Sequence, residues 1–348
     1  MTNEEATNKE ATNKEAEAMA DNTLEIRNLN TSFFTQHGEV RAVNDVSLDV
    51  RRAQITGIVG ESGCGKSMTA RSVMGLVRYP GRIVSGRIRL DGKEITGLSK
   101  KEMCSLRGNE LSMIFQEPMS SLNPVMKVGK QVEETLRIHQ HVTKEEAARR
   151  TEEIFREVGI SDARSRMACY PHQLSGGLRQ RVMIAMAMIC KPKLLIADEP
   201  TTALDVTVEA QILSLMKRLC EGGTSILLIS HNLGVIAQVC DYVYVMYAGR
   251  IVEQADTCTL FDHPAHPYTR ALLGAASSLR SGAARLETIP GGVPNLLHLP
   301  SGCSFSPRCE KCARQCQNEV PQMLPVSGEG HLARCYIREC PGGMRENA

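Results

Sequence analysis

The chain of 348 residues contains no tryptophan, few other aromatic residues and almost no net charge. Aromatic residues make up only 4% of it, so we expect no stacking platform for single-stranded nucleic acids. A formal net charge of +2 gives no basic field for a nucleic-acid backbone. No apolar run reaches the roughly 18 residues of a membrane-spanning helix. Any membrane role is therefore expected to be peripheral and to depend on a partner.

The N-terminal segment is polar and contains a short repeat, Ala6–Glu10 followed by Ala11–Glu15. It has no apolar face to bury, so we expect a disordered tail over residues 1–22. It also lacks the apolar core of a signal peptide, and the protein is expected to stay in the cytosol. In that reducing compartment the 13 cysteines do not predict a disulfide framework, although six of them crowd between Cys303 and Cys340.

From Leu24 onward the hydrophobic pattern predicts alternating strands and helices. The expected strands include Leu24–Asn28, Val43–Val50, Gln54–Gly60, Leu111–Gln116, Leu194–Ala197 and Ser225–Ser230. The expected helices include Ser67–Val77, Ser175–Cys190 and Val206–Cys220. This alternation predicts an α/β fold around a parallel sheet whose faces are covered. After Tyr268 the composition shifts to Pro, Gly and Cys, which marks a domain boundary near residues 255–290.

One segment matches the phosphate-binding loop G-x-x-x-x-G-K-[ST]. It reads Gly60-Glu61-Ser62-Gly63-Cys64-Gly65-Lys66-Ser67 and lies between an expected strand and an expected helix, as the motif requires. Its glycines let backbone N–H groups point at phosphate oxygens, and the helix N-terminus adds a favourable dipole. We expect Lys66 to reach the β- and γ-phosphates of ATP and Ser67 to bind Mg²⁺.

Two carboxylates, Asp198 and Glu199, follow an apolar strand. Ligands of parallel sheets bind beyond the carboxyl ends of the strands. Asp198 is therefore expected to hold Mg²⁺, and Glu199 to be the general base that polarises the attacking water. An acidic turn after a buried strand is the alternative, and the phosphate-binding loop argues against it.

A serine and two glycines open the helix expected after Leu174, in the order Ser175-Gly176-Gly177-Leu178-Arg179-Gln180. Bare N–H groups and a positive dipole end suit a phosphate. The segment resembles the signature motif of ATP-binding cassette (ABC) proteins. The resemblance implies that Ser175, Gly176, Gly177 and Gln180 complete the nucleotide site of an opposing subunit, so that ATP holds two cassettes together.

Four further residues resemble functional positions of the same family. Gln116 resembles the Q-loop residue that touches Mg²⁺ and water, and His231 the switch histidine that contacts the γ-phosphate. Asp205 matches the loop that crosses to the partner cassette, and it is also a candidate helix N-cap. Phe33 is favoured over its neighbour Phe34 as the aromatic residue that stacks on adenine, with a core role as the alternative.

Four more stretches resemble oligopeptide and dipeptide importers: Phe115–Pro124, His263–Thr269, Ile289–Pro294 and Gly302–Cys309. The resemblance implies an α/β fold, with a P-loop ABC nucleotide-binding domain over residues 23–265 and a small Cys-rich extension over 266–348. The domain would have a mixed sheet core, an antiparallel β subdomain and a helical subdomain at about 117–173. The implied function is ATP hydrolysis coupled to peptide uptake at the cytoplasmic face of the cell membrane.

The implied partners are two permease subunits, a second ABC ATPase in a heterodimer and an extracytoplasmic substrate-binding protein. Glutathione or nickel uptake by the same type of ATPase is an alternative. A non-transport ABC ATPase is disfavoured, because the chain holds one cassette and has no long coiled-coil insertion between Lys66 and Ser175. A redox-sensing binding module is disfavoured by the intact Lys66, Glu199 and His231.

Cys303, Cys309, Cys316 and Cys335 match the cysteines of the importers' C-terminal extension, with Cys312 and Cys340 in addition. Four thiolates on Pro- and Gly-rich turns suit either a [4Fe–4S] cluster or zinc. The cluster is favoured, because the intervals between the four differ from the paired C-x₂-C knuckles of zinc ribbons. Free thiols without a metal are the third interpretation.

Overall fold

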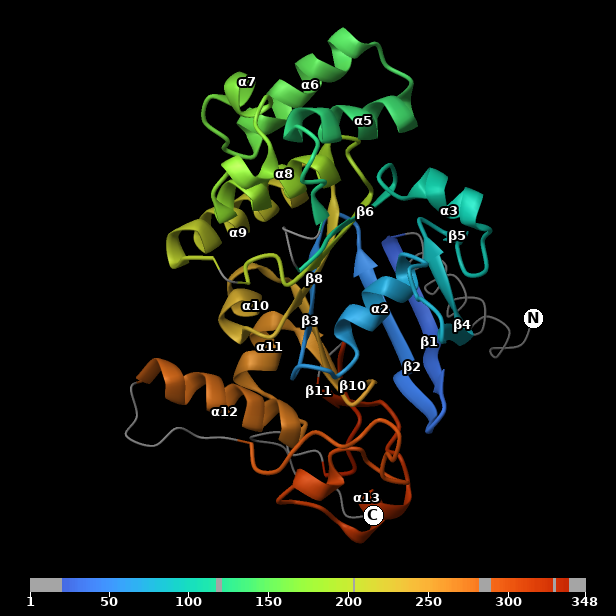
Figure 1. Cartoon of the computed structure of the whole chain (residues 1–348). Coiled ribbons are helices and arrows are strands. Elements are labelled where there is room, and N and C mark those ends of the chain that lie inside the picture. Colours follow the sequence, from blue (N-terminus) through green and yellow to red (C-terminus); the bar gives the residue numbers. More distant parts are fainter. Residues whose placement is uncertain (1–20, 117–120, 203, 282–288, 328–329, 338–348) are drawn as a thin grey trace, which may run out of the picture. The chain divides into compact units, whose positions relative to one another are not determined.

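The computed structural model describes residues 21–116, 121–202, 204–281, 289–327 and 330–337 (Figure 1). Most of the expected N-terminal tail, residues 117–120 and Cys340 lie outside these ranges. The chain divides into two compact units. The first comprises Met1–Ile26, Leu48–Ile55 and Arg87–Leu227, and the second comprises Arg27–Ser47, Thr56–Gly86 and Leu228–Ala348.

The described strands and helices follow the alternation expected from the sequence. The strands are β1 (Asn22–Thr35), β2 (Gly38–Arg51), β3 (Ile55–Val59), β4 (Gly81–Leu90), β5 (Lys93–Glu94), β6 (Leu111–Ile114), β7 (Leu194–Asp198), β8 (Ser225–Ser230), β9 (Tyr242–Tyr247), β10 (Arg250–Asp256), β11 (Leu324–Ser327) and β12 (His331–Ala333). The α-helices are α2 (Lys66–Val73), α3 (Lys100–Leu106), α5 (Val128–Gln140), α6 (Lys144–Glu157), α7 (Ala163–Arg166), α8 (Gly176–Met188), α9 (Val206–Glu221), α10 (Leu233–Val239), α11 (Thr257–Asp262), α12 (Pro267–Ser281) and α13 (Arg314–Asn318). Short 3₁₀ turns lie at Pro171–Gln173 and Ser306–Arg308.

The second unit contains a mixed sheet in the order β11-β12-β10-β9-β3. β3 runs parallel to β9, with Ile58 opposite Tyr244, whereas β10 is antiparallel to both β9 and β12. All of β3 and nearly all of β9 are buried, as expected for strands covered on both faces. The mixed sheet core implied by the family resemblance is thus confirmed, and the antiparallel part arises because the strands that follow β9 fold back as antiparallel neighbours.

The first unit contains a parallel strand pair and a helical cluster. β6 runs parallel to β7, with Met113 opposite Ile196. α8 packs on β6, and α5, α6 and α8 pack on one another (Figure 1). The cluster has an apolar interior in which Val132, Leu136 and Phe155 are fully buried. The amphipathic pattern of these helices therefore builds a packed helical region within this unit.

Helix α2 is shorter than the sequence suggested. It ends at Val73, whereas the apolar pattern extended the helix to Val77. Gly75 adopts a left-handed φ of 59°, the conformation that commonly follows a helix C-terminus. Among the described residues, no helix combines the length and the hydropathy needed to span a bilayer.

Candidate functional site

The predicted phosphate-binding loop connects β3 to α2, in the order that the motif requires. Gly60 and Gly65 have φ angles of 158° and 108°. A Cβ atom on Gly65 would lie 2.4 Å from the carbonyl oxygen of Ala42, and one on Gly60 would lie 2.1 Å from that of Met246. At both positions the backbone therefore has no space for a side chain, so glycine is required there.

Lys66, the first residue of α2, folds back onto the loop that precedes it. Its side chain is buried, and its Nζ donates to the carbonyl oxygens of Gly60 (2.7 Å) and Glu61 (3.0 Å). Cys64 is fully buried beneath the loop, and this burial raises the pKa of its thiol. Cys64 is therefore a packing residue, whereas the ammonium group of Lys66 must exchange two carbonyl partners when it reaches a phosphate.

Glu61 is held by two residues from the C-terminal part of the second unit. Its backbone N–H donates to Tyr268 Oη at 2.9 Å. Its carboxylate accepts two hydrogen bonds from the Arg308 guanidinium, at 2.8 and 3.1 Å. Neither partner was predicted from the sequence to lie at this site. The available signal was indirect, since Tyr268 and Arg308 lie in stretches that resemble importer motifs but carry no assigned chemistry.

In the first unit, Gln116 and Glu199 are brought into direct contact. Gln116 Nε2 donates to Glu199 Oε2 at 2.8 Å, and Thr202 Oγ1 donates to the same oxygen at 3.2 Å. Glu199 has a φ of 49°, which is unusual for a residue other than glycine and carries backbone strain. Asp198, at the end of β7, is buried. The role of Thr202 was not predicted from the sequence. The two adjacent threonines that follow Asp198-Glu199-Pro200 could have indicated that a hydroxyl group contacts Glu199.

The predicted signature segment lies at the N-terminus of α8, where Ser175 is the N-cap and its Oγ accepts from the Leu178 N–H at 3.4 Å. A Cβ atom on Gly176 would meet no other atom within 4 Å, whereas one on Gly177 would lie 3.1 Å from Val208 Cγ1, so the open position is that of Gly176. Gln180 is only 2% exposed, and its Nε2 donates to the Pro200 carbonyl at 2.7 Å. The amide of Gln180 thus holds the segment that follows Glu199.

Three further predicted site residues are Asp205, His231 and Phe33. Asp205 caps α9 by accepting from the Val208 N–H at 2.9 Å, so its expected capping role is confirmed. His231 follows β8 and is exposed, in the same unit as the phosphate-binding loop. Phe33 is half-buried, and its ring lies 2.7 Å from where a Cβ of Gly81 would be. Phe34 is 41% exposed, with the Arg82 guanidinium 4.4 Å from its ring centroid, and the choice between the two rings stays a prediction.

Four of the C-terminal cysteines line one small enclosed void. They are Cys303, Cys309, Cys316 and Cys335, whereas Cys312 is not among the lining residues. The void has a volume of about 10 Å³, roughly the space that one water molecule needs. Burial raises the pKa of Cys303 to about 11 and that of Cys335 to about 12, and the neighbouring thiols add to both shifts. In the described part of the chain, no three His, Cys, Asp or Glu residues are grouped closely enough to hold one metal ion.

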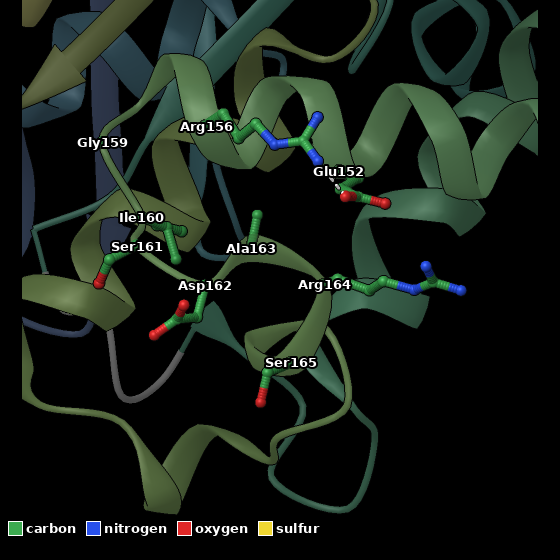
Figure 2. A pocket seen from close by; sticks show the side chains of 9 residues that line it. All are labelled: Glu152, Arg156, Gly159, Ile160, Ser161, Asp162, Ala163, Arg164 and Ser165. Atoms are coloured by element: carbon green, nitrogen blue, oxygen red, sulfur yellow. Dashed lines mark hydrogen bonds and ion pairs between the residues drawn. The ribbon is translucent and has the colours of Figure 1, made fainter.

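An open pocket of about 810 Å³ lies in the helical region of the first unit, between α6 and α7 (Figure 2). Its lining consists of Glu152, Arg156, Gly159, Ile160, Ser161, Asp162, Ala163, Arg164 and Ser165. Arg156 and Glu152 form an ion pair one helical turn apart on α6. None of the residues predicted to bind nucleotide or metal lines this pocket.

Two family models match separate parts of the chain. Residues 43–202 match the ABC transporter model, and residues 252–316 match the C-terminal region of oligopeptide/dipeptide transporters. The oligopeptide transport ATP-binding protein AppD of Bacillus subtilis is 48% identical over 321 residues, which cover 92% of this chain and 98% of AppD. OppD of Salmonella typhimurium, which has the same description, is 49% identical over 318 residues, covering 91% of this chain and 94% of OppD.

Solved structures of two other proteins share the fold of this chain. The cbiO1 protein of Clostridium perfringens, part of the ABC transporter complex cbiONQ, matches with a TM-score of 0.60 and 28% identity, covering 69% of this chain and 91% of its own. The ATP-binding cassette MJ0796, solved as a dimer bound to ADP and Pi, matches with a TM-score of 0.62 and 24% identity, covering 67% of this chain and 98% of its own. The chain therefore belongs to the family of oligopeptide/dipeptide ABC transporter ATP-binding proteins and is an ATP-hydrolysing subunit.

Proposed function

We propose that this chain hydrolyses ATP to drive peptide uptake through a membrane permease. The observation that carries the proposal is the near full-length identity with two oligopeptide transport ATP-binding proteins, which includes the C-terminal extension as well as the cassette. A cassette match alone would support ATP hydrolysis without a class of cargo. The extension narrows the class to oligopeptide and dipeptide transport.

The catalytic roles follow from the chemistry of each side chain. Lys66 binds the β- and γ-phosphates, and His231 contacts the γ-phosphate. Glu199 is the general base for the attacking water, and its carboxylate is oriented by the hydrogen bonds from Gln116 and Thr202. A hydrogen-bonded carboxylate loses little orientational freedom when the water arrives, which favours the reactive geometry.

The magnesium ion that accompanies ATP supplies charge neutralisation between the β- and γ-phosphates. Ser67, Gln116 and Asp198 are the proposed residues at that ion. Their hydroxyl, amide and carboxylate oxygens are the hard donors that Mg²⁺ takes from proteins. Asp198 is the last residue of β7, and ligands of parallel sheets bind beyond the carboxyl ends of the strands, which supports this assignment.

A second cassette completes each nucleotide site. We assign Ser175, Gly176 and Gly177, at the N-terminus of α8, to the phosphates held by the partner. The buried amide of Gln180 supports this helix start by holding Pro200. Asp205, at the start of α9, faces the partner in the same arrangement, and the partner is a second ABC ATPase rather than an identical copy.

The membrane partners are two permease subunits, supplied with cargo by an extracytoplasmic binding protein. The helical region of the first unit is the proposed docking site for a cytoplasmic helix of the permease. Its open pocket between α6 and α7 offers both apolar and charged side chains to such a helix (Figure 2). This arrangement places the chain at the cytoplasmic face of the membrane.

The four cysteines around the enclosed void are the proposed ligands of a [4Fe–4S] cluster. The described residues contain no group of three His, Cys, Asp or Glu side chains that could hold a metal ion, so the support for a cluster is that four cysteines line one void. The void among the four thiols has room for about one water molecule, so the turns that carry them would have to move apart to admit a cluster. The cluster would staple the Pro- and Gly-rich extension, and no step of ATP hydrolysis involves it.

The test is transport by the reconstituted complex. Proteoliposomes that hold the chain with its permeases and sister ATPase are given binding protein, external labelled peptide and internal ATP. Peptide accumulation that requires ATP supports the proposal. Stimulation of ATPase activity and uptake by glutathione or Ni²⁺, with no response to peptides, would assign the cargo to one of those instead.

A further inference from the structure

The side chain of Glu61, in the phosphate-binding loop, is bound by an arginine from the C-terminal extension. Arg308 Nη1 and Nη2 donate to the two carboxylate oxygens at 2.8 and 3.1 Å. Two parallel N–H···O bonds between a guanidinium and a carboxylate form the strongest and most directional of the side-chain ion pairs. The Arg308 side chain is only 5% exposed, so water screens this pair weakly.

Arg308 is itself fixed by the extension. Its Nε donates to the Pro290 carbonyl at 2.9 Å, Nη2 also donates to the Ile289 carbonyl at 3.2 Å, and Nη1 also donates to Tyr247 Oη at 3.3 Å. With the two bonds to Glu61, all five guanidinium donors have an acceptor. The hydrogen bonds to Glu61 raise the pKa of Arg308 above its usual value. The guanidinium cannot move without leaving buried donors unpaired, so it defines the position of Glu61.

The backbone of Glu61 contacts the catalytic lysine directly. Its carbonyl oxygen accepts from Lys66 Nζ at 3.0 Å, and its N–H donates to Tyr268 Oη at 2.9 Å. Tyr268 is fully buried and packs on Tyr247 and Phe305, with ring centroids 4.6 and 5.5 Å apart. Glu61 is thus held on its side chain by Arg308 and on its backbone by Tyr268.

The turn that carries Arg308 also carries two of the thiols around the enclosed void. Ser306 N–H donates to the Cys303 carbonyl at 2.9 Å, and Cys309 follows Arg308 directly. Arg308 N–H donates to the Phe305 carbonyl at 2.9 Å within the 3₁₀ turn Ser306–Arg308. A change in the packing of these thiols would therefore displace the guanidinium.

From these contacts we propose that Arg308, together with Tyr268, is a positioning residue for ATP binding. It holds Glu61 so that the phosphate-binding loop is preformed, and it makes nucleotide affinity depend on the integrity of the cysteine-bearing turn. The proposal gives a role to the His263–Thr269 and Gly302–Cys309 stretches. It goes beyond the proposed transport function and is independent of whether the thiols hold a metal.

A purely electrostatic role for Arg308 makes a different prediction. If Arg308 acted only by adding positive charge near the phosphates, its removal would weaken ATP binding and neutralisation of Glu61 would strengthen it. A positioning role requires that loss of either partner weakens binding, because either loss releases the loop. Glu61→Gln therefore separates the two explanations by the sign of its effect.

The experiment measures the Kd of a fluorescent ATP analogue, together with KM and kcat for ATP, on the full-length chain in its transporter complex. The variants are Arg308→Gln, Arg308→Lys, Glu61→Gln and the Arg308→Gln/Glu61→Gln double variant. The matched control is Arg334→Gln. Arg334 is another poorly exposed arginine of the extension, and its partners are Asp45, Ile251 and Pro321, none of which belongs to the phosphate-binding loop.

We expect Arg308→Gln and Glu61→Gln each to raise Kd and KM about tenfold, with kcat changed less than about twofold. The double variant should be no weaker than the worse single one, because both break the same pair. Arg308→Lys should be intermediate, since an ammonium group cannot make the two parallel bonds. Arg334→Gln should lower thermal stability and leave Kd unchanged.

Three results would overturn the proposal: tighter ATP binding by Glu61→Gln, strictly additive effects in the double variant, or the same rise in Kd for Arg334→Gln. If Arg308→Gln fails to fold, Glu61→Gln alone decides, because its side chain is 26% exposed and its loss leaves the extension's own contacts in place. An unchanged Kd for a folded Glu61→Gln variant would equally count against the positioning role of Arg308.

Discussion

Gln116 and Glu199 meet through a 2.8 Å hydrogen bond although they lie on separate strand ends. The register of the parallel pair β6 and β7 explains the contact, because Ile114 is opposite Ala197 and each functional residue follows two positions later. Residues that leave neighbouring parallel strands at the same level reach the same edge of the sheet. The candidate base and its orienting amide are therefore positioned by strand pairing.

The first prediction concerns the base itself. Glu199→Gln should lower kcat for ATP hydrolysis by at least about a hundredfold, because an amide cannot accept a proton from the attacking water. ATP affinity should be retained, so nucleotide should accumulate in a stable dimer with the partner cassette. Phosphate release and size-exclusion chromatography with ATP measure the two effects. Turnover at the wild-type rate would show that Glu199 is not the base.

The second prediction concerns the orientation of the base. Gln116→Ala should lower kcat about tenfold with a smaller change in KM, because Glu199 loses a donor that fixes its carboxylate. Thr202→Ala removes the longer of the two bonds, 3.2 Å against 2.8 Å, and should have the smaller effect. Steady-state kinetics of the two variants give the comparison. A larger kcat loss for Thr202→Ala would contradict this order.

The third prediction uses two glycines of the phosphate-binding loop as a matched pair. Both have left-handed φ angles, 108° at Gly65 and 78° at Gly63. A Cβ atom on Gly65 would collide with the Ala42 carbonyl, whereas one on Gly63 would meet no other atom within 4 Å. Gly63→Ala should therefore cost about 1 kcal/mol of unfolding free energy, from backbone strain alone.

Gly65→Ala should cost several times more, about 3 kcal/mol or above, because the steric overlap adds to the strain. Urea denaturation followed by circular dichroism measures both variants. Equal losses of stability would mean that the loop can shift away from Ala42 at little cost.

The fourth prediction concerns which cysteines of the extension bind a cluster. If four thiolates hold a cluster, Cys335→Ser should abolish bound iron and sulfide, because Cys335 is one of the four residues around the void. Cys312→Ser is the matched control: it lies in the same extension but does not line the void, so the variant should retain both. Iron and sulfide analysis of anaerobically purified protein gives the answer. Loss of metal from Cys312→Ser alone would reassign the ligands, and zinc in place of iron would reject the cluster.

Local structural elements could be predicted from the sequence, whereas contacts between distant segments could not. The phosphate-binding loop, the strand before Asp198 and the helix capped by Ser175 were all readable, because each depends on short-range chemistry: glycine conformations, apolar runs and an N-cap. Contacts between segments that are distant in the sequence could not be predicted. The contact of Arg308 with Glu61 depends on how the extension packs, and no periodicity or spacing in the chain encodes it.

The same limit explains the unpredicted strands of the second unit. β11 and β12 are four and three residues long. β12 is positioned by its pairing with β10, where Glu253 lies opposite Ala333. Strands this short lack a hydrophobic period that can be recognised in sequence. His331, on β12, completes a buried contact in which its Nε2 lies 2.8 Å from Glu253 Oε1.

The fifth prediction is a loss of stability in acid that originates at His266, a fully buried residue beside Glu253. Burial lowers the pKa of His266 from 6.5 to about 4, and the nearby Glu253 carboxylate only partly opposes this shift. The Tyr268 N–H donates to His266 Nδ1 at 3.0 Å, so this nitrogen must be an acceptor and the ring is neutral. Protonation would therefore break a buried hydrogen bond as well as bury a charge.

The direction of the stability change depends on whether the folded or the unfolded chain binds the proton. Between pH 6.5 and 4 the unfolded chain protonates His266 and the folded chain does not, so stability falls as the pH is lowered through this window. The difference of about 2.5 pKa units corresponds to about 3 kcal/mol by pH 4. Glu253 adds to the loss at lower pH. Burial works to raise its pKa, but the hydrogen bonds from His331 and from two backbone N–H groups outweigh burial and lower it.

Urea denaturation at pH 7.5, 6, 5 and 4 measures this slope, and His266→Gln is the variant that tests its origin. A glutamine keeps an acceptor near the Tyr268 N–H but does not titrate, so the variant should be less stable at pH 7.5 and lose less stability toward pH 4. His263→Gln is the control, because that exposed histidine lies three residues earlier in the same stretch. An unchanged slope in His266→Gln would place the acid sensitivity at other groups. Because Tyr268 also binds Glu61, the affinity for ATP should fall over the same pH range in the wild type and less in the variant.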